Sequence, residues 1–270
     1  MAFDGIVVAN LVHELKEQLL NGRIAKIAQP EADELLLTIK SPKGQRRLSI
    51  SASASLPLIY LTDANKPSPM TAPNFCMLLR KHIANGRIVD IWQPKLERII
   101  HFTIEHLDEL GDLCRKDLIV EIMGKHSNII FLNENRMILD SIKHVSCNVS
   151  SVREVLPGRD YFLPKTQEKA NPLTMTQETF YSMVYTKPTA IAKGIYTSLT
   201  GISPCIAEEI CFRASVDGSL SPQALSETAR EHLFHTFTRV MEDVKNGDFQ
   251  PNIVYNEKRG TSGICSHSSD

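Results

Sequence analysis

Asn21-Gly-Arg-Ile-Ala-Lys-Ile-Ala-Gln-Pro30 returns 64 residues later as Asn85-Gly-Arg-Ile-Val-Asp-Ile-Trp-Gln-Pro94, with seven of ten positions identical. Each copy follows a stretch with apolar residues at helical spacing, 6–20 and 73–84, and leads into a second strand-like run, 34–39 or 98–104. Because repeat solenoids need at least three stacked units, two copies predict a pseudo-symmetric sheet with two helices packed on it. Asp4 is expected to cap the first helix, and Gly22 and Gly86 are expected to end the two helices.

In the rest of the chain the hydrophobic pattern changes once, from strand-like to helical. Strand-like runs continue at 46–51, 57–61, 118–123, 128–132 and 137–142, whereas helical patterning takes over from about Pro172, at 177–185, 190–199, 204–215 and 221–244. These patterns predict an α+β fold. A mixed or antiparallel sheet domain with two packed helices (1–172) precedes an all-helical domain (173–250). Residues 251–270 carry no fold signal and are expected to be a disordered tail or the start of a further part.

Composition excludes several classes of protein. The net charge of -1 over 270 residues excludes a generally basic protein that coats nucleic acid. Any site for a polyanion must therefore be a local patch. None of the six cysteines forms a Cys-x-x-Cys pair, and His232 and His235 have no third ligand at a suitable spacing; no metal and no cofactor are therefore expected. The start resembles no secretory signal, and no apolar run reaches eighteen residues, which favours a cytoplasmic protein without a membrane span.

Gly124-Lys125-His126-Ser127 lies between two apolar runs, as expected for a turn joining two strands. A cation, an imidazole and a hydroxyl are more donor capacity than a reversal of the chain requires, so the turn is a candidate lip of a binding surface. Lys125 and His126 can contact RNA phosphate or sugar hydroxyls. The alternative is local hairpin chemistry, in which polar side chains bond their own backbone. For Asn128 the structural interpretation is preferred.

Several separated motifs, in order, resemble one family. Residues 1–255 resemble the NFACT-N module, the N-terminal part of bacterial RqcH proteins (also called fibronectin-binding protein A–like) and of their archaeal and eukaryotic relatives. Residues 190–245 resemble the helix-two-turns-helix domain that follows in this family. The motifs that carry the resemblance are Met1-Ala-Phe-Asp-Gly5, Asn74-Phe-Cys-Met-Leu-Leu-Arg-Lys81, Glu97-Arg98, Glu121-Ile-Met-Gly-Lys-His-Ser-Asn128 and Leu156-Pro-Gly158.

The resemblance implies a fold similar to that of formamidopyrimidine-DNA glycosylases and a role in ribosome-associated quality control. Members bind large ribosomal subunits obstructed by peptidyl-tRNA, recruit charged tRNA and promote untemplated alanine tailing of the stalled chain. Their tRNA-contacting residues fall on Glu97, Arg98, Glu121, Ile122 and Met123. Glu97 departs from the usual Asp, and alternation also predicts Ile122 in the core.

Arg98 is expected to open a strand and to reach a phosphate or base edge with its planar, two-pronged guanidinium. From sequence alone, an exposed Glu-Arg pair is more often a solvated ion pair worth about 0–1 kcal/mol. The surrounding stretch from Met70 to Arg98 has a surplus of cations that can steer RNA to the same edge: Arg80, Lys81, Arg87, Lys95 and Arg98, against Asp90 and Glu97.

Two other classes of function remain as alternatives. A glycosylase is disfavoured because the chain begins Met-Ala-Phe, without the Pro-Glu amino terminus that serves those enzymes as nucleophile, and no other catalytic motif is present. The protein is therefore expected not to be an enzyme. The second alternative is an adhesin that binds fibronectin at the bacterial surface without a signal peptide. Family members continue into a coiled coil and a further RNA-binding domain, so the chain is expected to be a part of such a protein.

Overall fold

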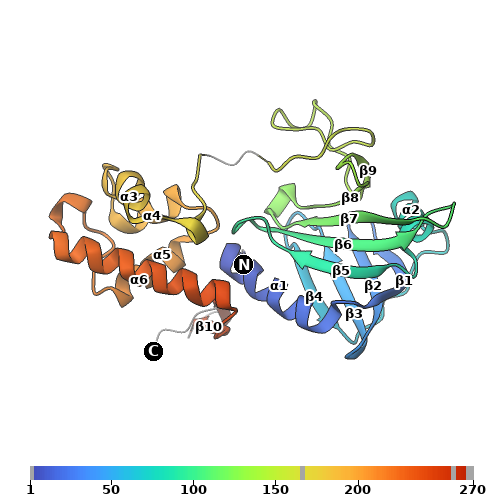
Figure 1. Cartoon of the computed structure of the whole chain (residues 1–270), viewed down its shortest axis with the longest axis horizontal. Coiled ribbons are helices and arrows are strands. Elements are labelled where there is room, and N and C mark those ends of the chain that lie inside the picture. Colours follow the sequence, from blue (N-terminus) through green and yellow to red (C-terminus); the bar gives the residue numbers. More distant parts are fainter. Residues whose placement is uncertain (1–2, 165–167, 257–259, 266–270) are drawn as a thin grey trace. The chain divides into compact units, whose positions relative to one another are not determined.

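The structure, a computed structural model, describes residues 3–164, 168–256 and 260–265, and it divides into two compact units (Figure 1). The sheet unit comprises residues 11–93 and 99–165. The helical unit comprises residues 166–270 together with 1–10 and 94–98. This division differs from a single boundary near residue 172, because two short segments from the first hundred residues belong with the later helices.

One antiparallel sheet forms the centre of the sheet unit (Figure 1), in the order β4-β3-β2-β1-β5-β6-β7-β8-β9. The α+β class is confirmed, and the strand pairs of this sheet are antiparallel throughout. The strands β1 and β5, which begin the two sequence copies, are neighbours. The strands are β1 Arg23–Glu31, β2 Glu34–Ser41, β3 Gly44–Ser51, β4 Leu58–Thr62, β5 Arg87–Trp92, β6 Ile99–Leu107, β7 Leu113–Glu121, β8 Asn128–Leu132 and β9 Ile138–Ser141.

A helix precedes each of the two central strands, as the repeat predicts. In α1 (Gly5–Leu19), Asp4 caps the first turn by accepting from the backbone N–H groups of Ile6 and Val7 at 3.1 and 2.9 Å. The second helix, α2 (Asn74–Ile83), buries Phe75, Cys76, Leu79 and Ile83, and contacts β1 and β6. The helical spacing of these apolar residues accounts for the packed face of α2.

Gly22 and Gly86 do not serve as the left-handed caps that the sequence predicts. The left-handed residues are Asn21 and Asn85, with φ of 63° and 60°. A Cβ on Gly22 would instead lie 2.6 Å from Cγ2 of Ile39, and a Cβ on Gly86 would lie 2.7 Å from Cγ2 of Ile104. The glycines are therefore required by the close approach of the next strand, while asparagine, which tolerates positive φ better than most residues, ends each helix.

Both faces of the inner strands β6 to β8 are buried. On β6, Ile100, Phe102 and Ile104 alternate with the buried Ile99 and His101. A second, smaller apolar cluster contains Ile99, Ile119, Ile130, Leu132, Ile138, Val155 and Tyr161. The segment that follows β9 therefore supplies the cover for one face of the sheet.

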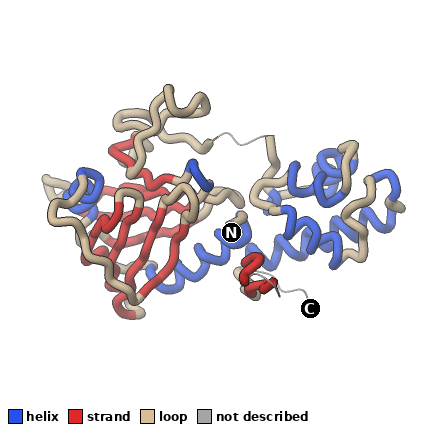
Figure 2. Tube along the Cα trace, turned by 180° about the vertical axis from the view of Figure 1, so that it is seen from behind, coloured by secondary structure: helices blue, strands red, loops and turns tan. Residues whose placement is uncertain are grey.

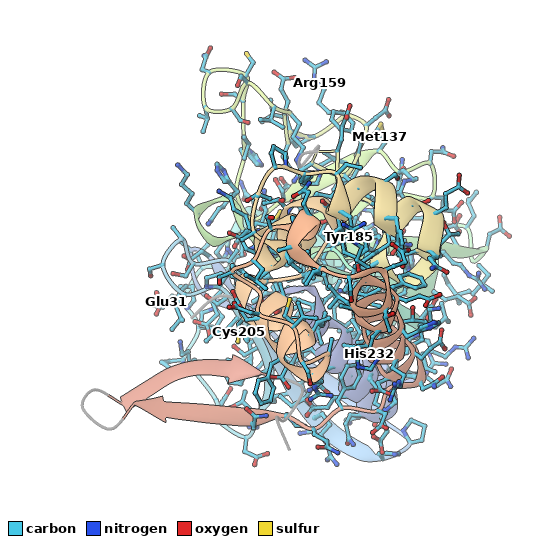
Figure 3. The ribbon with its side chains drawn as sticks, turned by 90° about the vertical axis from the view of Figure 1, so that its left-hand side faces the viewer. Glu31, Met137, Arg159, Tyr185, Cys205 and His232 are labelled. Carbon is cyan, nitrogen blue, oxygen red and sulfur yellow. The ribbon has the colours of Figure 1, made fainter. Side chains whose placement is uncertain are left out.

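The helical unit gathers its helices around a core of its own (Figure 2). Ser203 caps α5, with Pro204 at the first helical position as predicted. Tyr185, labelled in Figure 3, is buried in this core beside Phe180 at a ring-centroid distance of 5.5 Å. The α-helices are α3 Gln177–Phe180, α4 Ile191–Ser198, α5 Pro204–Arg213 and α6 Glu227–Asn246.

Three stretches of the helical unit differ from the predicted elements. The helix expected at 177–185 becomes π-helical over Tyr181–Tyr185. The helix expected from Ser221 begins later, because Ser226 provides the cap of α6 and a short 3-10 turn, Pro222–Ala224, precedes it. Within the stretch expected to lack structure, β10 (Asn252–Asn256) pairs with β11 (Gly260–Cys265), the two paired arrows in Figure 3.

Candidate nucleic-acid interface

The turn between β7 and β8 displays its cation and its imidazole. Gly124–His126 forms a 3-10 turn in which Lys125 and His126 are exposed, and Gly124 takes a φ of 54°. The buried Ser127 closes the turn, because its Oγ accepts from the backbone N–H of Met123 at 2.8 Å. Lys125 and His126 are thus held outward on a fixed backbone.

Asn128 has the structural role that was preferred from the sequence. Its buried amide donates from Nδ2 to the Lys143 carbonyl at 2.9 Å, and its Oδ1 accepts from the Lys143 N–H at 3.1 Å. This pair of hydrogen bonds mimics a strand pairing and ties β8 to the segment after β9.

Glu121 is placed differently from what a direct RNA contact requires. Its side chain is buried, ion-pairs with Arg153 and accepts from the Tyr161 hydroxyl at 3.1 Å. Burial raises the pKa of the Glu121 carboxyl, and Arg153 acts in the opposite direction. Both carboxylate oxygens are occupied inside the sheet unit, so Glu121 supports the end of β7 and the segment carrying Arg153.

The two residues after Glu121 are also turned toward the protein. Ile122 is buried, as alternation predicts, and Met123 is half-buried against the smaller apolar cluster. Of the segment from Glu121 to His126, the exposed side chains are therefore those of Lys125 and His126.

Glu97 and Arg98 belong to the helical unit, on a loop that Leu96 anchors in the helical core. Two glycines make room for this loop. A Cβ on Gly5 would lie 2.1 Å from the Leu96 carbonyl oxygen, and a Cβ on Gly201 would lie 2.0 Å from the same atom. Only glycine fits at both positions, since real Cβ atoms do not approach an oxygen so closely.

Asp4 and Ser203 lock the segments beneath this loop together. The Ser203 hydroxyl donates to Oδ2 of Asp4 at 2.6 Å while its oxygen accepts from the Ile206 N–H at 3.3 Å. The Gly5 N–H donates to the Gly201 carbonyl at 2.9 Å. Asp4 thus caps α1, Ser203 caps α5, and the two caps are hydrogen-bonded to each other. The Glu97–Arg98 loop packs on this junction through Leu96.

Three cations gather around Glu97 in the helical unit, and a fourth, Lys187, lies near one of them, Lys169. Burial raises the pKa of the Glu97 carboxyl, and the charges of Lys95, Arg98 and Lys169 act in the opposite direction. Burial lowers the pKa of the Lys169 amine, with Arg98 and Lys187 acting in the same direction and Glu97 against them. We call Lys95, Arg98, Lys169 and Lys187, together with Glu97, the basic cluster.

Lys169 and Lys187 were missed by the sequence interpretation. The Lys169 amine donates to the Tyr196 carbonyl at 2.9 Å, and the Lys187 amine donates to Oγ1 of Thr197 at 3.2 Å. Both acceptors lie in the last turn of α4, where the negative end of the helix dipole favours cations. No local motif marks either lysine, because only the fold brings Lys169 to Glu97 and Lys187 to Lys169.

The cations of residues 70–98 do not act as one group. Arg80 donates to the Ile27 carbonyl at 2.9 Å, Arg87 pairs with Glu105 at 2.8 Å, and Lys81 pairs with Glu109 at 3.3 Å. These three serve the sheet unit, whereas Lys95 and Arg98 belong to the helical unit. The predicted surplus of positive charge is thus divided between the sheet unit and the helical unit.

Trp92 has its indole ring stacked on the buried His101 at a centroid distance of 4.0 Å.

Within the described residues, no helix combines the length and the apolar character needed to cross a bilayer. In the same part of the chain, no three His, Cys, Asp or Glu side chains gather closely enough to hold a metal ion.

The chain is similar in sequence to known proteins. The model of the NFACT N-terminal and middle domains matches residues 4–268. The Rqc2 homolog RqcH of Bacillus subtilis is 37% identical over 239 residues, which cover 88% of this chain and 42% of that protein. Ribosome quality control complex subunit 2 of Saccharomyces cerevisiae is 30% identical over 129 residues, 48% of this chain and 12% of that protein.

The solved N-terminal part of the fibronectin/fibrinogen-binding protein from Streptococcus suis superposes with a TM-score of 0.76 at 29% identity, covering 99% of this chain and 93% of that one. The chain spans 42% of the length of its Bacillus subtilis relative. The family model covers nearly all described residues, including the Asp4–Gly5 start, the Glu97–Arg98 loop and the Gly124–His126 turn. The chain belongs to the family of NFACT N-terminal and middle domains.

Proposed function

We propose that the chain is the tRNA-binding part of a cytoplasmic, ribosome-associated quality control factor. Its partners are tRNA and large ribosomal subunits obstructed by peptidyl-tRNA, and its role is to promote untemplated alanine tailing of the stalled chain. The names of its relatives, among them a ribosome quality control complex subunit, support this role.

The observation that carries the proposal is the basic cluster. Arg98 offers a planar fork that matches the geometry of a phosphate, and three lysines add positive potential around it. Glu97 is half-buried and can hold the guanidinium of Arg98 in place or accept from an exocyclic amine of a base. The longer Glu97 side chain keeps the carboxylate that the resembled proteins supply with Asp.

The Gly124–His126 turn provides a second contact through Lys125 and His126, with Met123 beside them. Glu121 and Ile122 contribute by holding this turn, since one is paired inside the sheet unit and the other is part of the core. The protein binds and presents RNA without chemistry of its own; transfer of the peptide belongs to the ribosome.

The test is tRNA binding by the double variant Glu97→Ala/Arg98→Ala, measured by filter binding together with sequencing of co-purified RNA. The variant should lose tRNA while keeping its melting transition. The matched control is Lys81→Ala/Glu109→Ala, which removes an exposed ion pair of the sheet unit and should bind tRNA normally. Unchanged tRNA affinity in the Glu97/Arg98 variant rejects the proposal.

Fibronectin binding is the second candidate, favoured by the name of the Streptococcus suis relative. Immobilised fibronectin should then retain the chain in a manner that excess tRNA does not prevent. Failure of retention at micromolar concentration excludes this candidate and leaves the first intact.

A further inference from the structure

A cysteine, a histidine and a lysine meet on the sheet unit, at the end of β6 and β7 opposite to the Gly124–His126 turn. His106 of β6 and Cys114 of β7 are opposite partners in the antiparallel pairing, and Lys116 follows on the same face of β7. Cys114 and Lys116 are half-buried, and His106 is buried. The group thus lies at the surface but is fixed by the sheet.

Both ring nitrogens of His106 lie near the Cys114 sulfur, Nε2 at 3.1 Å and Nδ1 at 3.6 Å, and their other hydrogen bonds define their roles. Nδ1 lies 3.0 Å from the Leu107 carbonyl, which can only accept, so Nδ1 carries the proton in this arrangement. The other nitrogen, Nε2, is then an acceptor. It lies 3.1 Å from Sγ of Cys114 and 2.8 Å from Nζ of Lys116. The Lys116 ammonium is also 3.7 Å from the sulfur.

We propose that Cys114 is a modification site, a nucleophilic thiol that forms mixed disulfides with small-molecule disulfides. A thiol is activated where a neighbouring cation stabilises its thiolate. Here that cation is the Lys116 ammonium, which donates to Nε2 of His106 and is held by it beside the Cys114 sulfur. The Leu107 carbonyl fixes the orientation of the His106 ring.

The exchange step is balanced without an external oxidant. The Cys114 thiol releases its proton to water, and the thiolate attacks one sulfur of the small disulfide. The new bond joins Cys114 to that sulfur, and the old disulfide bond breaks. The leaving thiolate takes up a proton from water, so one small thiol is released for each mixed disulfide formed.

The neighbouring charges come from α2 and from the β6–β7 turn. His82 on α2 is within electrostatic range of both His106 and Lys116, and Lys81 beside it pairs with Glu109 of the β6–β7 turn at 3.3 Å. The other described cysteines provide internal references. Cys147 and Cys205 are exposed, whereas burial raises the pKa of Cys76 and raises that of Cys211 to about 12.

The test is limited labelling with iodoacetamide at neutral pH, read at each cysteine by peptide mass spectrometry. Cys114 should react about tenfold faster than Cys147, although Cys147 is more exposed. Oxidised glutathione should then add to Cys114 before any other cysteine. Faster reaction of Cys147 or Cys205 overturns the proposal, and this comparison needs no variant.

The variant His106→Asn tests whether His106 positions Lys116. The Cys114 rate should fall to within about twofold of the Cys147 rate, because Lys116 loses the acceptor that holds it beside the sulfur. The matched control His144→Asn alters an exposed histidine of the same unit that pairs with Asp140, and it should leave the Cys114 rate unchanged. An undiminished Cys114 rate in folded His106→Asn protein also overturns the proposal.

Discussion

Arg23 and Arg87, which occupy the same position in the two sequence copies, lie directly opposite each other where β1 meets β5. The backbone hydrogen bonds around them are equivalent in the two copies. The Asn21 N–H donates to the Ile88 carbonyl and the Asn85 N–H donates to the Ile24 carbonyl, each at 2.8 Å. An antiparallel pairing of equivalent residues creates a local two-fold axis. The duplicated segment therefore builds the centre of the sheet from two copies of one helix–strand joint.

The two-fold relationship predicts equal effects at equivalent positions. Asn21→Ala and Asn85→Ala should each destabilise the protein by about 1 kcal/mol, because alanine resists the positive φ found there. Asn21→Gly and Asn85→Gly should be nearly neutral, since glycine adopts that conformation freely. Urea denaturation checks the four variants. A cost at one position only would contradict the equivalence.

Gly201→Ala should destabilise the protein by about 3 kcal/mol or more, through left-handed strain combined with overlap of the new methyl group and the Leu96 carbonyl. Gly158→Ala is the matched control, because it has a similar positive φ but open space around a Cβ, and it should lose only about 1 kcal/mol. Thermal unfolding measures both. Equal losses would mean that the close approach does not matter.

Glu121→Ala should cost about 3–5 kcal/mol, because it leaves Arg153 buried without its partner. Once its folded fraction is taken into account, tRNA affinity should be unchanged. Lys125→Ala/His126→Ala should show the reverse, with weaker tRNA binding at unaltered stability. A stable Glu121→Ala protein that fails to bind tRNA would point to direct contact by this carboxylate.

His101 predicts a loss of stability in mild acid. Burial lowers its pKa to about 4 from 6.5, so below pH 6.5 the unfolded chain takes up a proton that the folded protein refuses. The contribution is complete above pH 6.5 and falls as pH decreases toward 4, by about 2 kcal/mol at pH 5. His101→Phe should remove this component, as urea denaturation at pH 7.5 and pH 5 will show. An unchanged pH dependence in the variant would contradict the assignment.

Lys169→Gln and Lys187→Gln should each weaken tRNA binding and reduce the slope of log affinity against log salt by about 1 if each contacts one phosphate. Lys245→Gln, an exposed lysine of the helical unit that pairs with Glu242 at 3.0 Å, is the control and should keep the full slope. Salt titrations of tRNA affinity decide between them. Identical slopes in all three variants would remove these lysines from the interface.

The sequence predicted what depends on neighbours along the chain. Period-two and helical patterns placed the strands and most helices, and the repeat indicated a pseudo-symmetric sheet. The pairing of β1 with β5 at its centre was not predicted. Asp4 as a cap also follows from local chemistry. Asn128 was correctly expected to be structural, but its partner is Lys143, 15 residues further along, and not its own turn.

What the sequence could not show depends on partners far away. Glu121 meets Arg153 and Tyr161, 32 and 40 residues further along, so nothing near it signals burial. Lys169 reaches Glu97, and Lys187 reaches Lys169, only through the packing of the helical unit. Gly22 and Gly86 were assigned to caps because close approach to Ile39 and Ile104 is invisible without the fold.

The bond between Asp4 and Ser203 joins residues 199 positions apart, and Ile6 and Leu96 complete the core of the helical unit. During synthesis, the first turn of α1 emerges long before its partners, and the strands emerge in between. The sheet unit can therefore form before Ser203, the hydrogen-bond partner of Asp4, has been synthesised. Excision of residues 168–250 alone would leave a bundle with an open core.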